Sequence, residues 1–294
     1  MTDPRREQQL TVAVAQPLVV PGDVAENLRR MTPMIEQAAQ RGADLVLFSE
    51  SHLTGYDHHG VAIEAAIALD DPAVEALAEL ARSLDLAIVT GLYERADDGS
   101  IHNSAAALLP DGRRIVERKH NIDPYEIGTG RVSAGARQRT TFDHRGATIG
   151  MLICADSGIP DIHDDLAGAG CDLVLAMTAG LGDADKGFSE SDLHDPARRA
   201  AYLESAASVC FPKGAIERAL AHDFAFAACN QAGYDAASAY FQPGHSMVVE
   251  RSGRLAALIP GQFCFDHLRP DLALGTVSLR CAVADPSGES PAHR

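Results

Sequence analysis

Three reactive side chains stand where the sequence predicts that a buried strand ends. Glu50 closes an apolar run over 44–48, and Cys154 closes a strand pattern over 148–154. Lys119 follows a further predicted strand and precedes a segment that turns away. Catalytic groups of α/β proteins commonly lie at the carboxyl ends of strands. We therefore treat Glu50, Lys119 and Cys154 as candidate members of a reaction site.

Each of these side chains suits a different chemical task. A carboxylate at the rim of a sheet, in low dielectric, makes a usable general base. An ammonium group can hold an oxyanion. A thiol at a tight turn between a strand and a helix lies near free backbone N–H groups, which lower its pKa and bind an oxyanion. Taken singly, each residue also fits a structural role: Glu50 as a turn cap, Lys119 on the surface, and Cys154 as a buried thiol.

The elements that position these residues follow an alternating order. Alternation predicts a strand over 10–15, Asp23 with Glu26 opens a helix, and Asp71 before a proline opens a second helix. We expect Pro33 to kink the first helix or delay its start. Hairpins are predicted over 103–117 and 140–154, helices over 162–169 and 196–221, and strands over 86–89, 172–177, 224–228, 246–249 and 255–259. This order predicts an α/β layered fold with mixed sheets.

One internal match relates the two halves of the chain. Residues 42–47 and 170–175 agree at five of six positions, each at the end of a predicted helix. Either two similar βα halves share one core, or two junctions built by the same rules coincide.

Composition narrows the function classes. The 294 residues carry 25 Lys+Arg and 41 Asp+Glu, a net charge of −16, which argues against a basic nucleic-acid-binding surface. With 46% apolar residues and no apolar run near the length of a membrane span, we expect a cytoplasmic protein that binds no membrane. Six cysteines without a CxxC pair argue against a disulfide scaffold and a thiolate zinc site.

Taken together, the ordered motifs resemble the nitrilase superfamily of carbon–nitrogen hydrolases. The resemblance extends from about Leu10 to Leu258, and Glu50, Lys119 and Cys154 stand where that family has its Glu-Lys-Cys triad. The matching blocks are Ala13 to Gln16, Gly42 to Glu50, Leu53 to Tyr56, Gly91 to Arg95, Asn103-Ser104, Pro110 to Gly112, Arg118-Lys119, Gly135, Ile153 to Asp156, Pro160-Asp161, Ala215 to Ala219, Asn230 to Gly233, Gly244 to Ser246 and Gly253.

The resemblance implies a four-layer αββα sandwich that forms a homodimer or a higher homo-oligomer. One domain is expected over 8–284, with flexible termini at 1–7 and 285–294. Glu126 matches the family's second glutamate, which positions the lysine and the substrate. The backbone N–H of Ala155 is expected in the oxyanion hole, and Tyr56 is expected to contact the substrate or its oxyanion.

The implied activity is thiol hydrolysis of a small amide or N-carbamoyl compound through a thioester, with release of ammonia or amine. No metal or organic cofactor is expected. Ala155 stands where the family usually has a large aromatic residue, and the chain contains no Trp, so the shape of the pocket and the substrate stay open. Asp156 is closer to the amidase and carbamoylase branches than to true nitrilases, which leaves nitrile hydrolysis as the alternative.

Other interpretations compete with this one. His52, Asp57, His58 and His59 lie close together in the sequence, as in a metal hydrolase, but fit no standard zinc motif. Ser246 lies in no GxSxG elbow, so the interpretation as a serine hydrolase has even less support. A catalytically silent binding protein is a third alternative.

The charged segment over 181–212 is either a solvated face or part of the pocket wall. A substrate carboxylate would have four candidate partners: Arg131, Lys186, Arg198 and Arg199.

Overall fold

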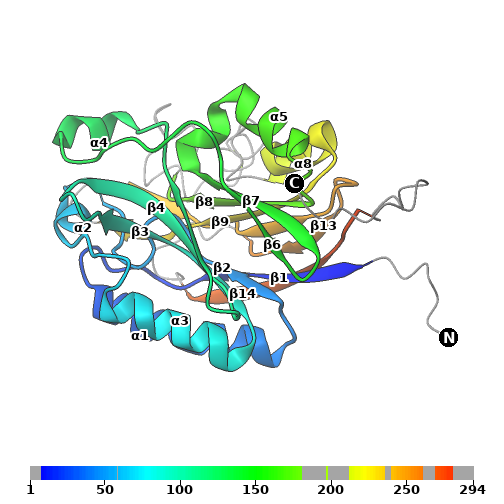
Figure 1. Ribbon diagram of the computed structural model, residues 1–294, viewed down its shortest axis with the longest axis horizontal. Coiled ribbons are helices and arrows are strands. Elements are labelled where there is room, and N and C mark those ends of the chain that lie inside the picture. Colours follow the sequence, from blue (N-terminus) through cyan, green and yellow to red (C-terminus); the bar gives the residue numbers. More distant parts are fainter. Residues whose placement is uncertain are drawn as a thin grey trace, which may run out of the picture.

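Two six-stranded sheets stacked face to face form the centre of the molecule, and helices cover both outer surfaces (Figure 1). The computed structural model describes residues 8–57, 59–180, 197, 212–235, 240–260 and 269–280. The expected flexible termini at 1–7 and 285–294 lie outside these residues, as do Lys186, Arg198 and Arg199.

The first sheet is built mainly from the N-terminal half of the chain. Its strand order is β14-β1-β2-β3-β4-β5, with β1, β2 and β3 parallel and the other pairs antiparallel. Its elements are β1 (Gln9–Gln16), α1 (Val24–Gln40), β2 (Leu45–Leu47), α3 (Pro72–Leu84), β3 (Ala87–Arg95), β4 (Ile101–Leu108), β5 (Arg114–Arg118) and β14 (Asp271–Ser278).

The second sheet repeats this arrangement. Its order is β13-β12-β9-β8-β7-β6, with β7, β8 and β9 parallel and the other pairs antiparallel. The matching sequences over 42–47 and 170–175 lead into β2 and β8, the middle strands of the two parallel trios, so the chain contains two similar halves. The elements are β6 (Thr141–His144), β7 (Ala147–Ile153), α5 (Pro160–Gly168), β8 (Leu173–Thr178), α8 (Pro212–His222), β9 (Ala225–Asn230), β12 (Met247–Val249) and β13 (Leu255–Leu258).

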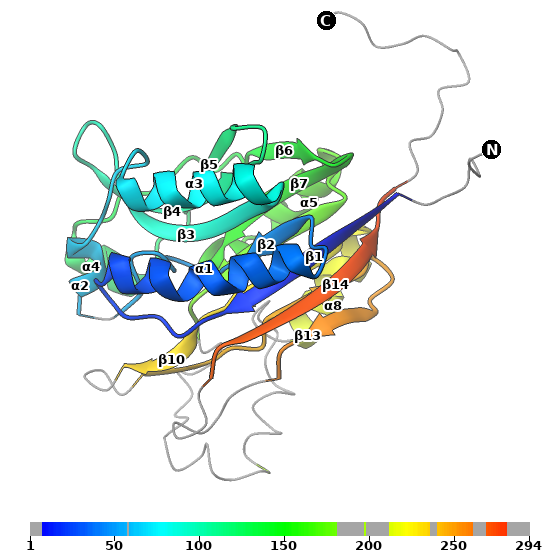
Figure 2. The ribbon, with the colours of Figure 1, turned by 90° about the horizontal axis from the view of Figure 1, so that it is seen from below.

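Three apolar layers hold the sheets and helices together. Side chains such as Val12, Leu47 and Leu175 fill the space between the sheets. Alternate residues of the first sheet pack with α1 and α3, which run side by side across its outer face (Figure 2). The second sheet packs in the same way with α5 and α8. This arrangement confirms the expected αββα sandwich.

Local signals explain where α1 and α3 begin. The Asp23 side chain accepts the N–H of Glu26 at the start of α1, and Asp71 caps α3 before a first-turn proline. Pro33 lies inside α1, so it does not delay the start of the helix; the Asp23 cap and the buried apolar face of α1 fix the start instead. Elements that the sequence did not indicate are β14, α2 (Val61–Glu64), α4 (Pro124–Thr129), β10 (Ala232–Asp235) and β11 (Tyr240–Pro243).

Of the predicted helix over 196–221, the structure describes Ala197, which is helical, and the segment from Pro212 that begins α8. Among the described residues, no helix combines the length and the apolarity that crossing a bilayer requires.

Gly91 in β3 allows the chain after β2 to lie directly on its neighbour. A Cβ atom at Gly91 would lie 2.1 Å from the Ser51 nitrogen and 2.7 Å from the Glu50 carbonyl carbon. Backbone hydrogen bonds from Gly91 to the Ser49 oxygen and from Leu53 to the Gly91 oxygen fix this approach. The glycine therefore determines where Glu50 enters the end of the sheet.

We expect Gly91→Ala to lower the free energy of unfolding by at least about 2 kcal/mol, because the new methyl group meets backbone that cannot move aside cheaply. Urea unfolding measures this change. The control is Gly168→Ala at the end of α5, where a Cβ meets no atom within 4 Å, and it should leave stability unchanged or slightly higher. Equal effects of the two substitutions would contradict this account of Gly91.

Candidate active site

Glu50 lies where the ends of the two sheets meet. It follows β2, and its backbone N–H donates to the carbonyl oxygen of Thr178 at the end of β8, at 3.4 Å. Its side chain is buried, and Oε1 accepts hydrogen bonds from Lys119 Nζ at 2.7 Å and Asn103 Nδ2 at 2.8 Å. Oε2 is buried with no hydrogen-bond partner among the described residues. This oxygen is free to accept a proton.

Lys119 extends from the end of β5 into the same cluster. Its backbone N–H donates to the Asn103 carbonyl oxygen at 2.8 Å, and its side chain is fully buried. The ammonium nitrogen lies 2.7 Å from Glu50 Oε1, 2.8 Å from Glu126 Oε2 and 3.1 Å from Asp123 Oδ2. Burial alone would lower the pKa of Lys119, but the surrounding negative charges outweigh burial and hold this pKa well above its usual value. Lys119 is therefore a cation in the site.

The helix α4 returns Glu126 to the lysine that precedes it by seven residues. Asp123 caps this helix, Pro124 occupies its first turn, and Glu126 Oε2 accepts the Asp123 N–H at 3.4 Å, which completes a capping box. Glu126 Oε1 accepts hydrogen bonds from Asn103 Nδ2 at 2.7 Å and from the Tyr93 hydroxyl at 3.1 Å. Asn103 thus bridges the two buried carboxylates.

Cys154 begins a short 3₁₀ helix, η1 (Cys154–Gly158), directly after β7. Its φ of 42° lies in the left-handed region, which is strained for a residue with a Cβ and is typical of a nucleophile at a sharp turn. The side chain is half-buried, and in its thiolate form Cys154 would help raise the pKa of Lys119. Because Ala155 is in the first turn of η1, its N–H has no acceptor within the helix.

Asp156 links the turn at Cys154 to the segment over 119–123, here called the lysine loop. Its buried carboxylate accepts the backbone N–H groups of His120 at 3.0 Å and Asn121 at 2.7 Å, while Asn121 Nδ2 donates to the Ala155 oxygen at 2.9 Å. Arg139 Nη1 lies 3.1 Å from Asp156 and 3.0 Å from Glu117. This network fixes the relative position of Lys119 and Cys154.

The structure brings the predicted Glu50, Lys119 and Glu126 into direct contact and places Cys154 beside the lysine loop. The Tyr56 hydroxyl donates to Asp123 Oδ2 at 2.7 Å. Asp123 was not predicted from the sequence; the signal that could have identified it is the Asp-x-x-Glu pattern over 123–126, which is typical of a capping box.

The residues of the competing interpretations have other partners. The Asp57 carboxylate accepts backbone N–H groups at the start of α2, the buried His52 ring is hydrogen-bonded to Ser49, and His58 lies outside the described residues. The Ser246 hydroxyl is buried and donates to Gln16 Oε1 at 2.8 Å. Arg131 pairs with Glu64 at 3.0 Å on the surface.

One group of described side chains has carboxylate oxygens close enough together to hold a metal ion: Glu50, Asp123 and Glu126. The Lys119 ammonium already contacts all three carboxylates, so the positive charge of this cluster is supplied by the chain itself.

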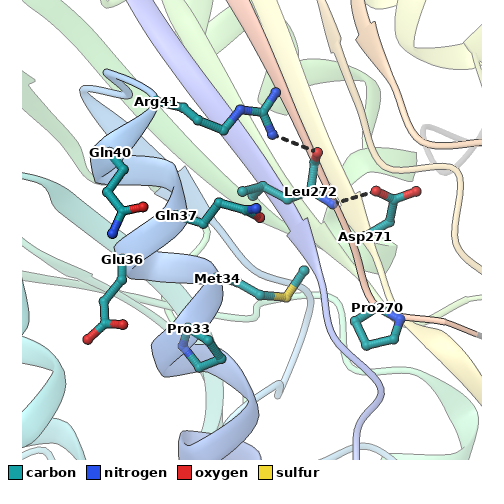
Figure 3. A pocket seen from close by; sticks show the side chains of 9 residues that line it. All are labelled: Pro33, Met34, Glu36, Gln37, Gln40, Arg41, Pro270, Asp271 and Leu272. Atoms are coloured by element: carbon teal, nitrogen blue, oxygen red, sulfur yellow. Dashed lines mark hydrogen bonds between the residues drawn. The ribbon is translucent and has the colours of Figure 1, made fainter.

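A groove elsewhere on the molecule contains none of these residues (Figure 3). It has a volume of about 470 Å³ and lies between α1 and the start of β14, where Arg41 donates to the Leu272 carbonyl oxygen at 3.2 Å. Its lining residues are Pro33, Met34, Glu36, Gln37, Gln40, Arg41, Pro270, Asp271 and Leu272.

Two curated relatives align with part of the chain. An (R)-stereoselective amidase from Pseudomonas sp. is 31% identical over 160 residues, which cover 54% of this chain and 57% of the amidase. An aliphatic nitrilase from Rhodococcus rhodochrous is 28% identical over 158 residues, which cover 49% of this chain and 43% of the nitrilase. The chain thus spans about half the length of each.

A solved structure has the same fold over almost the whole length. The amidase from Nesterenkonia sp. superposes with a TM-score of 0.72 at 20% identity and covers 93% of this chain and 92% of its own. A variant of the amidase from Nesterenkonia sp. AN1 carries the acetamide moiety of fluoroacetamide covalently at its active-site cysteine.

The carbon-nitrogen hydrolase family profile matches residues 11–264, which is most of the sequence and includes every residue of the cluster described above. The chain therefore belongs to the carbon-nitrogen hydrolase family.

Proposed function

We propose that this protein is a thiol hydrolase that cleaves the C–N bond of a small amide or N-carbamoyl compound, with Cys154 as nucleophile. The buried contact of Lys119 with Glu50 and Glu126 supports this proposal most strongly. An ammonium fixed beside a carboxylate that keeps one oxygen without a partner suits acyl transfer to a neighbouring thiol.

In the first half-reaction, Glu50 takes the thiol proton of Cys154 through its unpartnered Oε2. The thiolate attacks the carbonyl carbon, and the negative charge that develops on the carbonyl oxygen is stabilised by Lys119 and by the Ala155 N–H. Glu50 then gives its proton to the departing nitrogen. Ammonia or amine leaves, and a thioester on Cys154 remains.

In the second half-reaction, the same carboxylate takes a proton from water, and the resulting nucleophile attacks the thioester carbonyl. The oxyanion of the second tetrahedral intermediate is held by the same donors, and its collapse breaks the C–S bond and releases the acid. Glu50 gives its proton to the departing sulfur, which restores the Cys154 thiol and the Glu50 carboxylate. One general base thus serves both steps. Lys119 keeps its charge throughout, and Glu126 holds it in position.

The substrate class is proposed from two observations. Asp156 follows the nucleophile by two residues, as in the amidase and carbamoylase branches, and an amidase is among the relatives at 31% identity. The aliphatic nitrilase relative at 28% identity keeps nitrile hydrolysis as a second candidate.

The test is ammonia release from a panel of aliphatic amides, N-carbamoyl amino acids, carbamoyl amines and nitriles. We expect turnover of an amide or N-carbamoyl compound, and a loss of at least about a thousandfold in Cys154→Ala and in Glu50→Gln, because nucleophile and base act as one unit. Circular dichroism checks that both variants remain folded. An active Cys154→Ala protein would overturn the proposal, and turnover of nitriles alone would select the second candidate.

Cys171 provides the matched control for the nucleophile. It is buried beside the second sheet, and burial raises the pKa of its thiol to about 12. We expect Cys171→Ala to retain wild-type turnover. At pH 7, iodoacetamide should label Cys154 while Cys171 and Cys229 stay unmodified, as read by peptide mass spectrometry.

Glu126 should make stability depend on pH. Burial raises the pKa of Glu126 from 4.5 to about 7, and the charge of Glu50 adds to this effect while Lys119 opposes it. A raised folded-state pKa gives stability that is present below about pH 4.5 and is lost as the pH rises through about 7. Relative to Glu126→Gln, the wild-type free energy of unfolding should fall by about 3 kcal/mol between pH 4.5 and pH 8. Urea unfolding of both proteins at these pH values tests this, and parallel pH profiles would contradict it.

A further inference from the structure

Every N–H donor of the Lys119 ammonium is already engaged. An ammonium group has three donors and no acceptor. They reach Glu50 Oε1 at 2.7 Å, Glu126 Oε2 at 2.8 Å and Asp123 Oδ2 at 3.1 Å. The proposed mechanism needs one of these donors on the substrate oxygen, so one carboxylate must give up its hydrogen bond when the substrate arrives.

Asp123 differs from the other two carboxylates in its exposure. Its side chain is 22% exposed, whereas those of Glu50 and Glu126 are fully buried. Its contact with Lys119 is also the longest of the three. A charged hydrogen bond weakens as solvent reaches it, so the contact with Asp123 is the one that costs least to break.

Asp123 also has partners that keep it in place after release. Its Oδ2 accepts the Tyr56 hydroxyl at 2.7 Å, and its Oδ1 accepts the backbone N–H groups of Tyr125 at 3.1 Å and Glu126 at 3.2 Å at the start of α4. After the contact with Lys119 is lost, each carboxylate oxygen of Asp123 therefore still accepts a hydrogen bond.

Breaking the hydrogen bond of Lys119 to Glu50 or to Glu126 would cost more free energy than breaking the one to Asp123. Both carboxylates are fully buried, and a buried charge that loses its ion-pair partner is strongly destabilised. Glu50 must also stay beside Lys119 while it exchanges protons with the thiol and the leaving nitrogen.

We propose that Asp123 holds the third N–H of Lys119 in the resting enzyme, and that the substrate carbonyl oxygen replaces Asp123 Oδ2 on that N–H. The Tyr56 hydroxyl keeps the displaced carboxylate hydrogen-bonded. One hydrogen bond breaks and one forms, with no proton transferred. Asp123 and Tyr56 are positioning residues that set how readily the oxyanion donor becomes available. The inference depends on the proposed function, because that function assigns Lys119 to the oxyanion.

The first variant is Asp123→Asn. Asparagine still accepts N–H groups at the start of α4 through its oxygen, but its NH₂ group cannot accept from an ammonium. We expect KM for the best amide or N-carbamoyl substrate to fall about tenfold, with kcat within about threefold of wild type, because the substrate no longer competes with a carboxylate. The control is Asp71→Asn at the cap of α3, which should leave both constants unchanged.

The second variant is Tyr56→Phe, for which we expect KM to change in the opposite direction. Without the hydroxyl, a displaced Asp123 Oδ2 loses its remaining donor, so KM should rise about tenfold while kcat stays within about threefold. In the Asp123→Asn background, the same Tyr56→Phe change should have no effect on KM. A hydroxyl that bound substrate directly would raise KM in both backgrounds, and one with only a packing role would raise it in neither.

The outcomes separate this inference from the proposed function. A wild-type enzyme that hydrolyses nothing in the panel overturns the proposed function and this inference with it. An active wild type overturns the inference alone if Asp123→Asn lowers kcat and leaves KM unchanged or higher, because Asp123 would then support Lys119 throughout the reaction. Opposite shifts of KM in the two single variants, with no Tyr56→Phe effect in the double variant, would support it.

Discussion

The Lys119 ammonium is the contact on which the rest of the site depends. Two fully buried carboxylates, Glu50 and Glu126, lie close together, and ionised groups in such a place need a buried countercharge. Lys119 supplies it and in doing so joins three segments of the chain: the end of β2, the end of β5 and the start of α4. The cation therefore serves as a structural link as well as a chemical group.

The repeated fold explains why these segments meet. Each half contributes three parallel strands to its sheet. The two sheets stack so that the backbone N–H of Glu50, after β2, donates to the carbonyl oxygen of Thr178, at the end of β8. Cys154 follows β7 in the second sheet, so the nucleophile and the base come from different sheets. Their relative position depends on links across the sandwich, which Asp156 and Arg139 provide through the lysine loop.

Local patterns were sufficient to predict most of the strands and helices and an α/β layered fold, whereas the αββα sandwich was expected from the family resemblance. Alternating apolar residues marked the strands, the caps at Asp23 and Asp71 marked two helices, and the ends of three strands marked Glu50, Lys119 and Cys154. The edge strand β14 was missed, and its pairing with β1, at the other end of the sequence, is one that no local pattern specifies.

The contacts within the site were harder to predict. Asp123 was not predicted, because its contact with Lys119 depends on how α4 turns back over the lysine loop. Asn103 belonged to a recognised motif. Its hydrogen bonds to both Glu50 and Glu126, however, require β4 to lie beside β5 and next to α4. Such contacts follow from tertiary geometry, which spacing along one chain does not specify.

The most direct test of the account is to look for the thioester itself. The wild-type protein would be mixed with its best amide or N-carbamoyl substrate, quenched in acid during turnover and digested for peptide mass spectrometry. We expect an added acyl or carbamoyl mass on the peptide that contains Cys154, and no such mass in Glu50→Gln. The same mass on a different residue, with Cys154 unmodified during turnover, would contradict it.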